Sequence, residues 1–143
     1  MTACTLTVAA VLVTACASNT AGIAVSDARI GMPTGPNAAL YLTATGVADR
    51  LVGAATSVAG HVELHESVTD EDGSTVMRPV DGFDLEGDAS LVLEPGGGHL
   101  MLVDVDRLEV GETVEITLTW QRAGDMVIRA EVVVPAEVIG HDR

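Results

Sequence analysis

Residues 113–120 read TVEITLTW, and this stretch decides the expected fold class. Its even positions are apolar and end on Trp120, whereas its odd positions are threonine or glutamate. A strict period of two predicts a strand with one buried face. Residues 126–134, MVIRAEVVV, alternate in their first half, and the segment 121–125 between the two stretches contains Gly124. Together they predict a β-hairpin.

Outward from this hairpin, the chain is a series of short β-rich runs. Gly, Pro, Asn and Asp separate them at intervals of roughly ten residues, as in an all-β sandwich. No stretch has a helical period over a dozen residues, and there is no internal repeat or second-domain linker. We therefore expect a single all-β domain over residues 23–135, followed by a short tail at 136–143. The runs are ALYLTAT (39–45), RLVGAAT (50–56), HVELHESV (61–68), TVMRPV (75–80), SLVLE (90–94) and HLMLVDV (99–105).

Composition limits what the protein can bind. Of the 143 residues 48% are hydrophobic but only 2% are aromatic, so the core has to be aliphatic. The chain has seven Arg, no Lys and 21 acidic residues, which gives a net charge of −14. Such a surface repels phosphate backbones and anionic lipid, so nucleic-acid binding is excluded and membrane attachment needs an anchor other than charge.

The N-terminus resembles an export signal. Residues 6–17, LTVAAVLVTACA, form an uncharged apolar run that is too short to span a bilayer and is typical of a signal peptide. The run contains VTAC (13–16), which resembles the bacterial lipobox, in which the cysteine receives a lipid. We expect a signal peptide over 1–15, lipidation of Cys16 and a polar tether over 16–22. The alternative is an ordinary secretory signal, with Cys16 incidental.

Familiar enzyme chemistry is missing from the sequence. Cys4 would be removed with the signal and Cys16 acylated, so the exported body would have no thiol nucleophile, redox pair or cysteine zinc site. GxSxG, HExxH and phosphate-loop motifs are absent. The glycine run 95–98 is expected to be a turn between strands. We predict a protein that is not an enzyme.

Histidine and methionine form the one suggestive group. Alternation places His99 and Met101 together on the face opposite Leu100, and His65 on the outward face of its own run. Met77 follows an acidic loop. Thioethers bind Cu(I) well and Zn²⁺ poorly, and they resist oxidation outside the cytoplasm better than thiols. Taken singly, such residues are usually core filler or surface histidines, which is the alternative interpretation.

At this point the sequence resembles the bacterial periplasmic copper chaperone family PCu(A)C over roughly residues 23–134. In that family's metal motif 21 residues lie between a Met and His-x-Met, and here the 21 residues 78–98 separate Met77 from His99-Leu100-Met101. The other matching pieces are Ala39-Leu40-Tyr41-Leu42-Thr43, Asp49-Arg50-Leu51-Val52, Val62-Glu63-Leu64-His65-Glu66, Val76-Met77-Arg78-Pro79-Val80, Leu93-Glu94-Pro95-Gly96-Gly97-Gly98 and Ala123-Gly124.

The resemblance implies a cupredoxin-like Greek-key β-sandwich with Cu(I), as cargo, bound by His65, Met77, His99 and Met101. It also implies copper delivery to the CuA centre of cytochrome c oxidase subunit II, often together with a Sco-type protein. Two departures stand out. Eleven residues separate His65 from Met77, about one more than in the family motif, and Glu66-Ser67 stands where many members have a further Met. His61 is expected to be a surface histidine.

The sequence thus predicts an exported copper carrier, lipid-anchored on the outer face of the cytoplasmic membrane. Its ligands would lie near one end of the sandwich, exposed enough for copper to exchange, with neither His99 nor Met101 facing the core. One alternative is a copper-buffering or resistance lipoprotein without a dedicated oxidase partner. The other is an adhesive or scaffolding lipoprotein whose His and Met residues are incidental.

Overall fold

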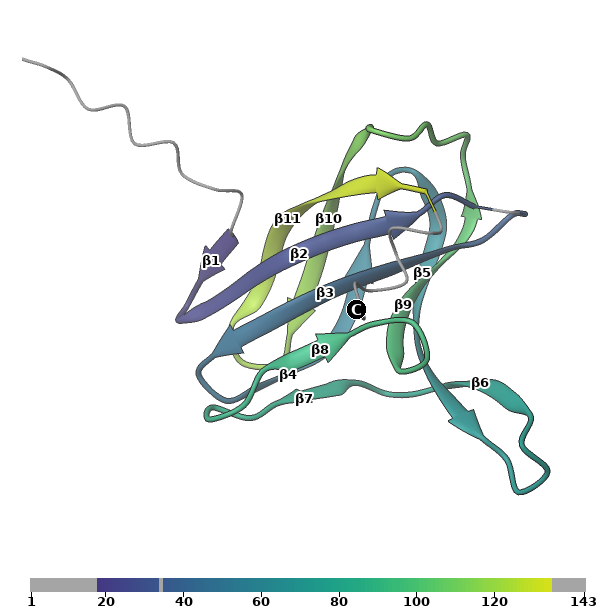
Figure 1. Cartoon of the computed structure of the whole chain (residues 1–143). Helices are drawn as coiled ribbons and strands as arrows, with labels where there is room; N and C mark the ends of the chain where they lie inside the picture. Colours follow the sequence, from purple (N-terminus) through teal and green to yellow (C-terminus); the bar gives the residue numbers. More distant parts are fainter. Residues whose placement is uncertain (1–17, 34, 135–143) are drawn as a thin grey trace, which may run out of the picture.

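In the computed structural model, which describes residues 18–33 and 35–134, every regular element is a β-strand (Figure 1). The all-β prediction is confirmed, and no helix in the described part of the chain is long and apolar enough to cross a membrane. The strands are β1 (Ser18–Thr20), β2 (Ile23–Gly31), β3 (Ala38–Gly46), β4 (Asp49–Ala55), β5 (Ala59–Thr69), β6 (Thr75–Pro79), β7 (Phe83–Leu85), β8 (Leu91–Leu93), β9 (Gly98–Val105), β10 (Thr113–Trp120) and β11 (Gly124–Val133).

The strands form one continuous hydrogen-bonded path in the order β6-β5-β9-β3-β2-β11-β10-β4-β7. Two short strands lie off the path, because β1 pairs with β2 and β8 pairs with β3. All the pairs are antiparallel except that of β2 with β11. β4 and β5 are in contact although they are far apart along this path, so the sheet curls round into a sandwich.

The β10–β11 hairpin forms as predicted. The apolar positions of β10, up to Trp120, are all buried, and those of β11 from Met126 to Val132 alternate in step with them. The loop is shorter than expected, because Gly124 already pairs with Trp120. Each aliphatic side chain buried in this way contributes about 1.5–3 kcal/mol, so the aliphatic core compensates for the scarcity of aromatic residues.

Sequence alternation missed strand β2. Its register against β3 shifts between Ser26 and Arg29, and Asp27 in that bulge has a φ of 54°. Before the bulge the odd-numbered residues Ile23 and Val25 face inward, and after it the even-numbered Ile30 does. A search for strict period two cannot find a strand that is interrupted in this way.

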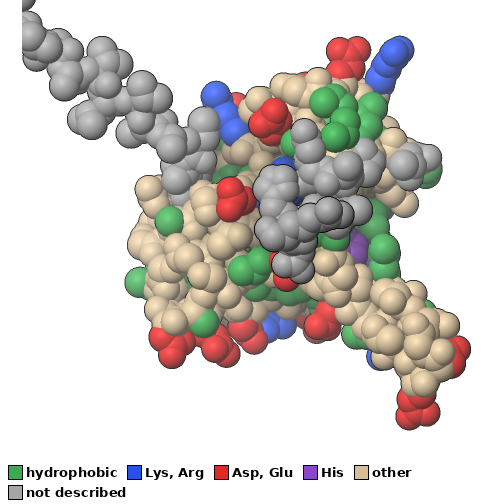
Figure 2. Space-filling model, in the orientation of Figure 1, with side chains coloured by type: hydrophobic (Ala, Val, Ile, Leu, Met, Phe, Trp, Pro, Cys, Tyr) green, Lys and Arg blue, Asp and Glu red, His purple; other side chains and the backbone are tan. Residues whose placement is uncertain are grey.

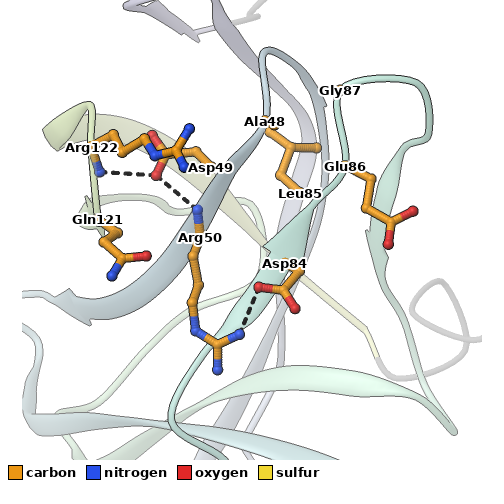
Figure 3. A pocket seen from close by; sticks show the side chains of 9 residues that line it. All are labelled: Ala48, Asp49, Arg50, Asp84, Leu85, Glu86, Gly87, Gln121 and Arg122. Carbon is orange, nitrogen blue, oxygen red and sulfur yellow. Dashed lines mark hydrogen bonds and ion pairs between the residues drawn. The ribbon is translucent and has the colours of Figure 1, made fainter.

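A carboxylate fixes the end of the β10–β11 hairpin to β4. Asp49 accepts hydrogen bonds from the backbone N–H groups of Arg50 (2.7 Å), Arg122 (2.9 Å) and Ala123 (2.9 Å), as Figure 3 shows in part. Desolvation, which would raise the pKa of Asp49, is outweighed by these donors, and the pKa is lowered. The carboxylate lines an open pocket of about 390 Å³, where Arg50 also pairs with Asp84. The polar side chains that line this pocket therefore stabilise the contact between β4 and its neighbours.

The N-terminal boundary differs from the expected one. Residues 18–20, predicted as part of the tether, form β1 and pair with β2 from Ile23 to Val25. The predicted signal peptide (1–15), Cys16 and the tail (136–143) lie outside the described residues.

Candidate metal centre

Strand register brings the four predicted ligands to one face of the sheet. His65 in β5 is directly opposite His99 in β9, and Met101 is opposite Glu63, two residues before His65. On the other side of β5, Met77 in β6 is opposite Ser67, two residues after His65. Directly opposed residues share a face, as do residues two apart in one strand. All four ligands therefore lie on the same side of β6, β5 and β9.

The two imidazoles are neighbours at the centre of this group. Their ring centroids are 5.6 Å apart and the planes are tilted by 58°. On the other side of β9, the ring of Tyr41 in β3 lies 6.2 Å from that of His99. Flanked in this way, His99 is only 3% exposed. It points away from Leu100 as predicted, but the expectation that it is open to solvent is wrong.

Each imidazole has a buried nitrogen with no hydrogen-bond partner. Within the described residues, three buried side-chain polar atoms lack a partner: Nδ1 of His65, Nε2 of His99 and Nε1 of Trp120. Unpaired buried polar atoms are rare and costly in folded proteins. That two of the three fall on adjacent histidines fits a site for a cation that accepts nitrogen lone pairs.

The environment of His99 favours its neutral form. Desolvation by burial lowers the pKa of His99, a backbone hydrogen bond with Gly97 acts in the opposite direction, and the nearby His65 lowers the pKa further. A neutral imidazole has a free lone pair, which is the form that binds metal. At neutral pH the buried imidazole of His99 therefore has the form that a metal ligand requires.

The two methionines differ in exposure. Met101 is half-buried, whereas Met77 is 59% exposed on the β5–β6 hairpin that projects from the body (Figure 1). In Figure 2 the tip of this hairpin is acidic, and histidine surface shows only as a small patch beside the body. The pairing of β5 with β6 runs without a break from His65–Pro79 to Thr69–Thr75, so Met77 lies on the same face as His65.

A glycine lets the loop before β9 pack tightly. The predicted turn is present, since Gly97 N–H donates to the Glu94 carbonyl over 3.0 Å. Gly98, directly before His99, has a further role. A Cβ there would lie 2.7 Å from Cε1 of Phe83 and 3.0 Å from Cδ2 of Leu93. Only glycine allows β7 and β8 to approach the start of β9 this closely.

Glu63 lies beside the candidate ligands and was not among the predicted site residues. Its carboxylate is 2.8 Å from Nε2 of His65 and 3.0 Å from Nε2 of His61. Hydrogen bonds with His65 and then with His61 lower the pKa of Glu63. The spacing of residues 61, 63 and 65, which puts a glutamate between two histidines on one strand face, could have indicated this contact. Among the described residues, no three or more His, Cys, Asp or Glu side chains form a metal-binding group of their own.

Comparison with known proteins gives both a family and a fold. The family model described as "Putative lipoprotein LpqE-like" matches residues 23–132. The copper-bound PCuAC domain from PmoF2 superposes with a TM-score of 0.70 at 25% identity, covering 83% of this chain and 98% of that domain. The Cu(I) form of DR1885 from Deinococcus radiodurans gives 0.62 at 31% identity, with 76% of each chain covered. The cupredoxin-like fold predicted from the resemblance is confirmed.

One curated relative matches a shorter stretch. "Putative lipoprotein Lxx21020" of Leifsonia xyli subsp. xyli is 38% identical over 69 residues, which are 48% of this chain. The match spans 42% of the length of that relative.

Proposed function

The chain belongs to the LpqE-like family of PCu(A)C type, and from this premise we propose that it is an extracytoplasmic copper chaperone that carries Cu(I). His65, Met77, His99 and Met101 are the proposed ligands. PCu(A)C-type proteins are copper chaperones, so the proposed role is that of a carrier without catalysis.

The strongest support for a copper site is that two buried histidine nitrogens without a hydrogen-bond partner share a sheet face with two methionines. Nδ1 of His65 and Nε2 of His99 need a partner, and strand register puts Met77 and Met101 on the same face. Thioethers are soft donors that favour Cu(I), and neutral imidazoles also bind copper, so this set of four donors suits Cu(I). Solved relatives whose names state bound copper, such as the Cu(I) form of DR1885, share the fold.

The uneven exposure of the ligands suits transfer. His99 holds its position deep in the face, whereas Met77 lies at the surface on an edge strand. A partner that displaces Met77 first could take copper stepwise, without unfolding the site. This refines the expectation of an open site: exchange would begin at one ligand.

The acceptor and the location form the finer part of the proposal. We propose delivery towards the CuA centre of cytochrome c oxidase subunit II, with a Sco-type protein as a possible second partner. The carrier would be exported and lipid-anchored through Cys16 on the outer face of the cytoplasmic membrane. The lipoprotein names of its family and of its curated relative support the anchor. Copper buffering without an oxidase partner is the second candidate, because it needs the same ligand set.

An anaerobic titration tests the metal proposal. The soluble body is titrated with Cu(I) against a competing chelator, and in parallel with Zn²⁺. We expect one Cu(I) per chain, with affinity for Cu(I) above that for Zn²⁺ by orders of magnitude, because thioethers hold Zn²⁺ poorly. Comparable Zn²⁺ affinity at the same residues would contradict the soft-donor site, and absence of Cu(I) binding would favour a scaffolding lipoprotein.

A transfer assay separates chaperone from buffer. The Cu(I)-loaded protein is mixed with the apo copper domain of oxidase subunit II. The two proteins are separated at intervals, and the copper content of that domain is measured with and without a Sco-type protein. A chaperone loads that domain faster than the same concentration of chelator-bound copper does. Equal rates would leave buffering as the function.

A further inference from the structure

Glu63 holds two imidazoles at once. Its Oε2 is 2.8 Å from Nε2 of His65, and its Oε1 is 3.0 Å from Nε2 of His61. The carboxylate is about half exposed, His61 is more exposed, and the His65 side chain is only 15% exposed. Glu63 thus links the exposed imidazole of His61 to the largely buried imidazole of His65.

The hydrogen bond determines where the proton of His65 sits. An ionised carboxylate only accepts hydrogen bonds, so Nε2 of His65 has to carry the hydrogen. In a neutral imidazole the other nitrogen then has a free lone pair. That nitrogen, Nδ1, is buried and has no partner among the described residues. The carboxylate on one side of the ring therefore leaves a metal-binding atom on the other.

The strand builds this arrangement. Residues 61, 63 and 65 share a face of β5, and the pairing of His65 with His99 fixes the ring beside the second imidazole. Because Glu63 and His65 are two residues apart on the same face of β5, the carboxylate of Glu63 reaches Nε2 of His65 over 2.8 Å.

We propose that Glu63 is a positioning residue that holds His65 as its Nε2–H tautomer, so that Cu(I) is bound through Nδ1 of His65. This inference rests on the proposed function. Carboxylates that orient a ligating histidine in this way typically contribute about 10–100-fold to metal affinity. His61 stabilises the carboxylate from the exposed side and does not itself bind copper.

The test starts with the apo protein, which is labelled with ¹⁵N in histidine and kept at a pH where the imidazoles are neutral. Long-range ¹H–¹⁵N spectra distinguish protonated from unprotonated ring nitrogens. We expect the wild-type His65 to be protonated on Nε2 alone. In Glu63→Ala the Nδ1–H form should become populated, whereas Glu66→Ala, the matched change at the next glutamate on the opposite face of β5, should leave the spectrum of His65 unchanged.

Cu(I) affinity is then measured for the same proteins by chelator competition. Glu63→Ala should weaken binding about tenfold or more. Glu63→Gln, which keeps an acceptor oxygen, should retain most of the affinity, and His61→Ala should have the smallest effect. A Glu63→Gln loss as large as that of Glu63→Ala, with His65 still protonated on Nε2, would show that charge rather than tautomer matters, and would overturn the mechanism.

The two levels of the proposal fail differently. If the wild type binds no Cu(I), the proposed function fails. If the wild type binds Cu(I) and Glu63→Ala binds it equally well with His65 still on Nε2–H, the role of Glu63 fails while the copper site stands.

Discussion

The exposure of each proposed ligand determines whether replacing it changes only Cu(I) affinity or also the stability of the fold. Met77 is 59% exposed on an edge strand, so its thioether does little for the fold. We expect Met77→Leu to weaken Cu(I) binding about tenfold, or about 1.4 kcal/mol, because leucine has no donor atom. Stability of the apo protein should change by less than about 0.5 kcal/mol. Chelator competition and denaturant unfolding measure the two quantities.

Met126 offers the matched control for that experiment. It is 1% exposed in β11, where it packs in the core. Met126→Leu nearly conserves volume and should cost less than about 1.5 kcal/mol of stability while leaving Cu(I) affinity unchanged. If both variants lose copper equally, the effect comes from the fold and Met77 is not a ligand.

His99 carries a prediction about pH. Burial lowers its folded-state pKa below the usual value of about 6.5. Protonation is therefore easier in the unfolded chain, so the stability due to neutral His99 is complete above about pH 6.5 and is lost as the pH falls towards the lowered folded pKa. We expect the melting temperature of the apo protein to fall on acidification through this range, and that of His99→Gln to fall less. Parallel slopes for the two proteins would contradict this.

At the scale of the element, Asp49 tests how the hairpin end is held. Its carboxylate accepts three backbone hydrogen bonds and its pKa is lowered. Asparagine keeps one acceptor oxygen, so Asp49→Asn should destabilise the fold by about 1–2 kcal/mol at neutral pH. A lowered carboxyl pKa gives stability above about pH 3.8 that disappears as the pH falls further, so the variant should lose less stability in acid than the wild type.

Asp84 is the control for that measurement, because it is mostly exposed and Arg50 is its one ion-pair partner among the described residues. Asp84→Asn should change stability by less than about 1 kcal/mol. Copper affinity should be unaffected by either change, since Asp49 and Asp84 lie on β4 and β7, whereas the candidate ligands lie on β5, β6 and β9. Equal destabilisation by the two variants would show that the backbone donors of Arg122 and Ala123 do not depend on Asp49.

The strands show why sequence predicts some elements and misses others. β10 was predictable because its alternation is unbroken, whereas β2 was not, because the bulge at Asp27 changes its inward positions. β7 has only three residues, too few for a period to appear. Period two also assigned His99 to the outward face correctly. It could not predict that the rings of His65 and Tyr41, from strands distant in sequence, would bury that face.

On the scale of the whole molecule, the β5–β6 hairpin and strand β1 lie at different edges. Figure 1 shows β1 at one edge and the β5–β6 hairpin projecting from the other. The described chain begins at Ser18, two residues after Cys16 in sequence, and residues 18–20 are already paired with β2. A lipid on Cys16 would therefore attach close to the folded body, and the β5–β6 hairpin that carries Met77 would project from the opposite edge.

The charge of the molecule makes that lipid important. With a net charge of −14 and no Lys, the body is repelled by an anionic membrane. A membrane-bound acceptor would then meet the carrier only by free diffusion, whereas an anchor confines both to one surface and raises their effective concentration. We expect Cys16→Ser to release the protein from the membrane fraction or to block its processing. Oxidase activity should fall most when copper is scarce and recover when copper is added.

Cys4→Ser is the matched control, because Cys4 lies in the predicted signal peptide. It should leave the protein in the membrane fraction. Cu(I) affinity should be the same for all three proteins, because both cysteines lie outside the residues 23–132 that match the family. If the wild type is found fully soluble and cleaved after Ala15 or Ala17 without a lipid, the anchor is wrong. The copper site would survive that result, since its ligands lie on β5, β6 and β9, and the carrier would then have to find its acceptor by diffusion through the surrounding compartment.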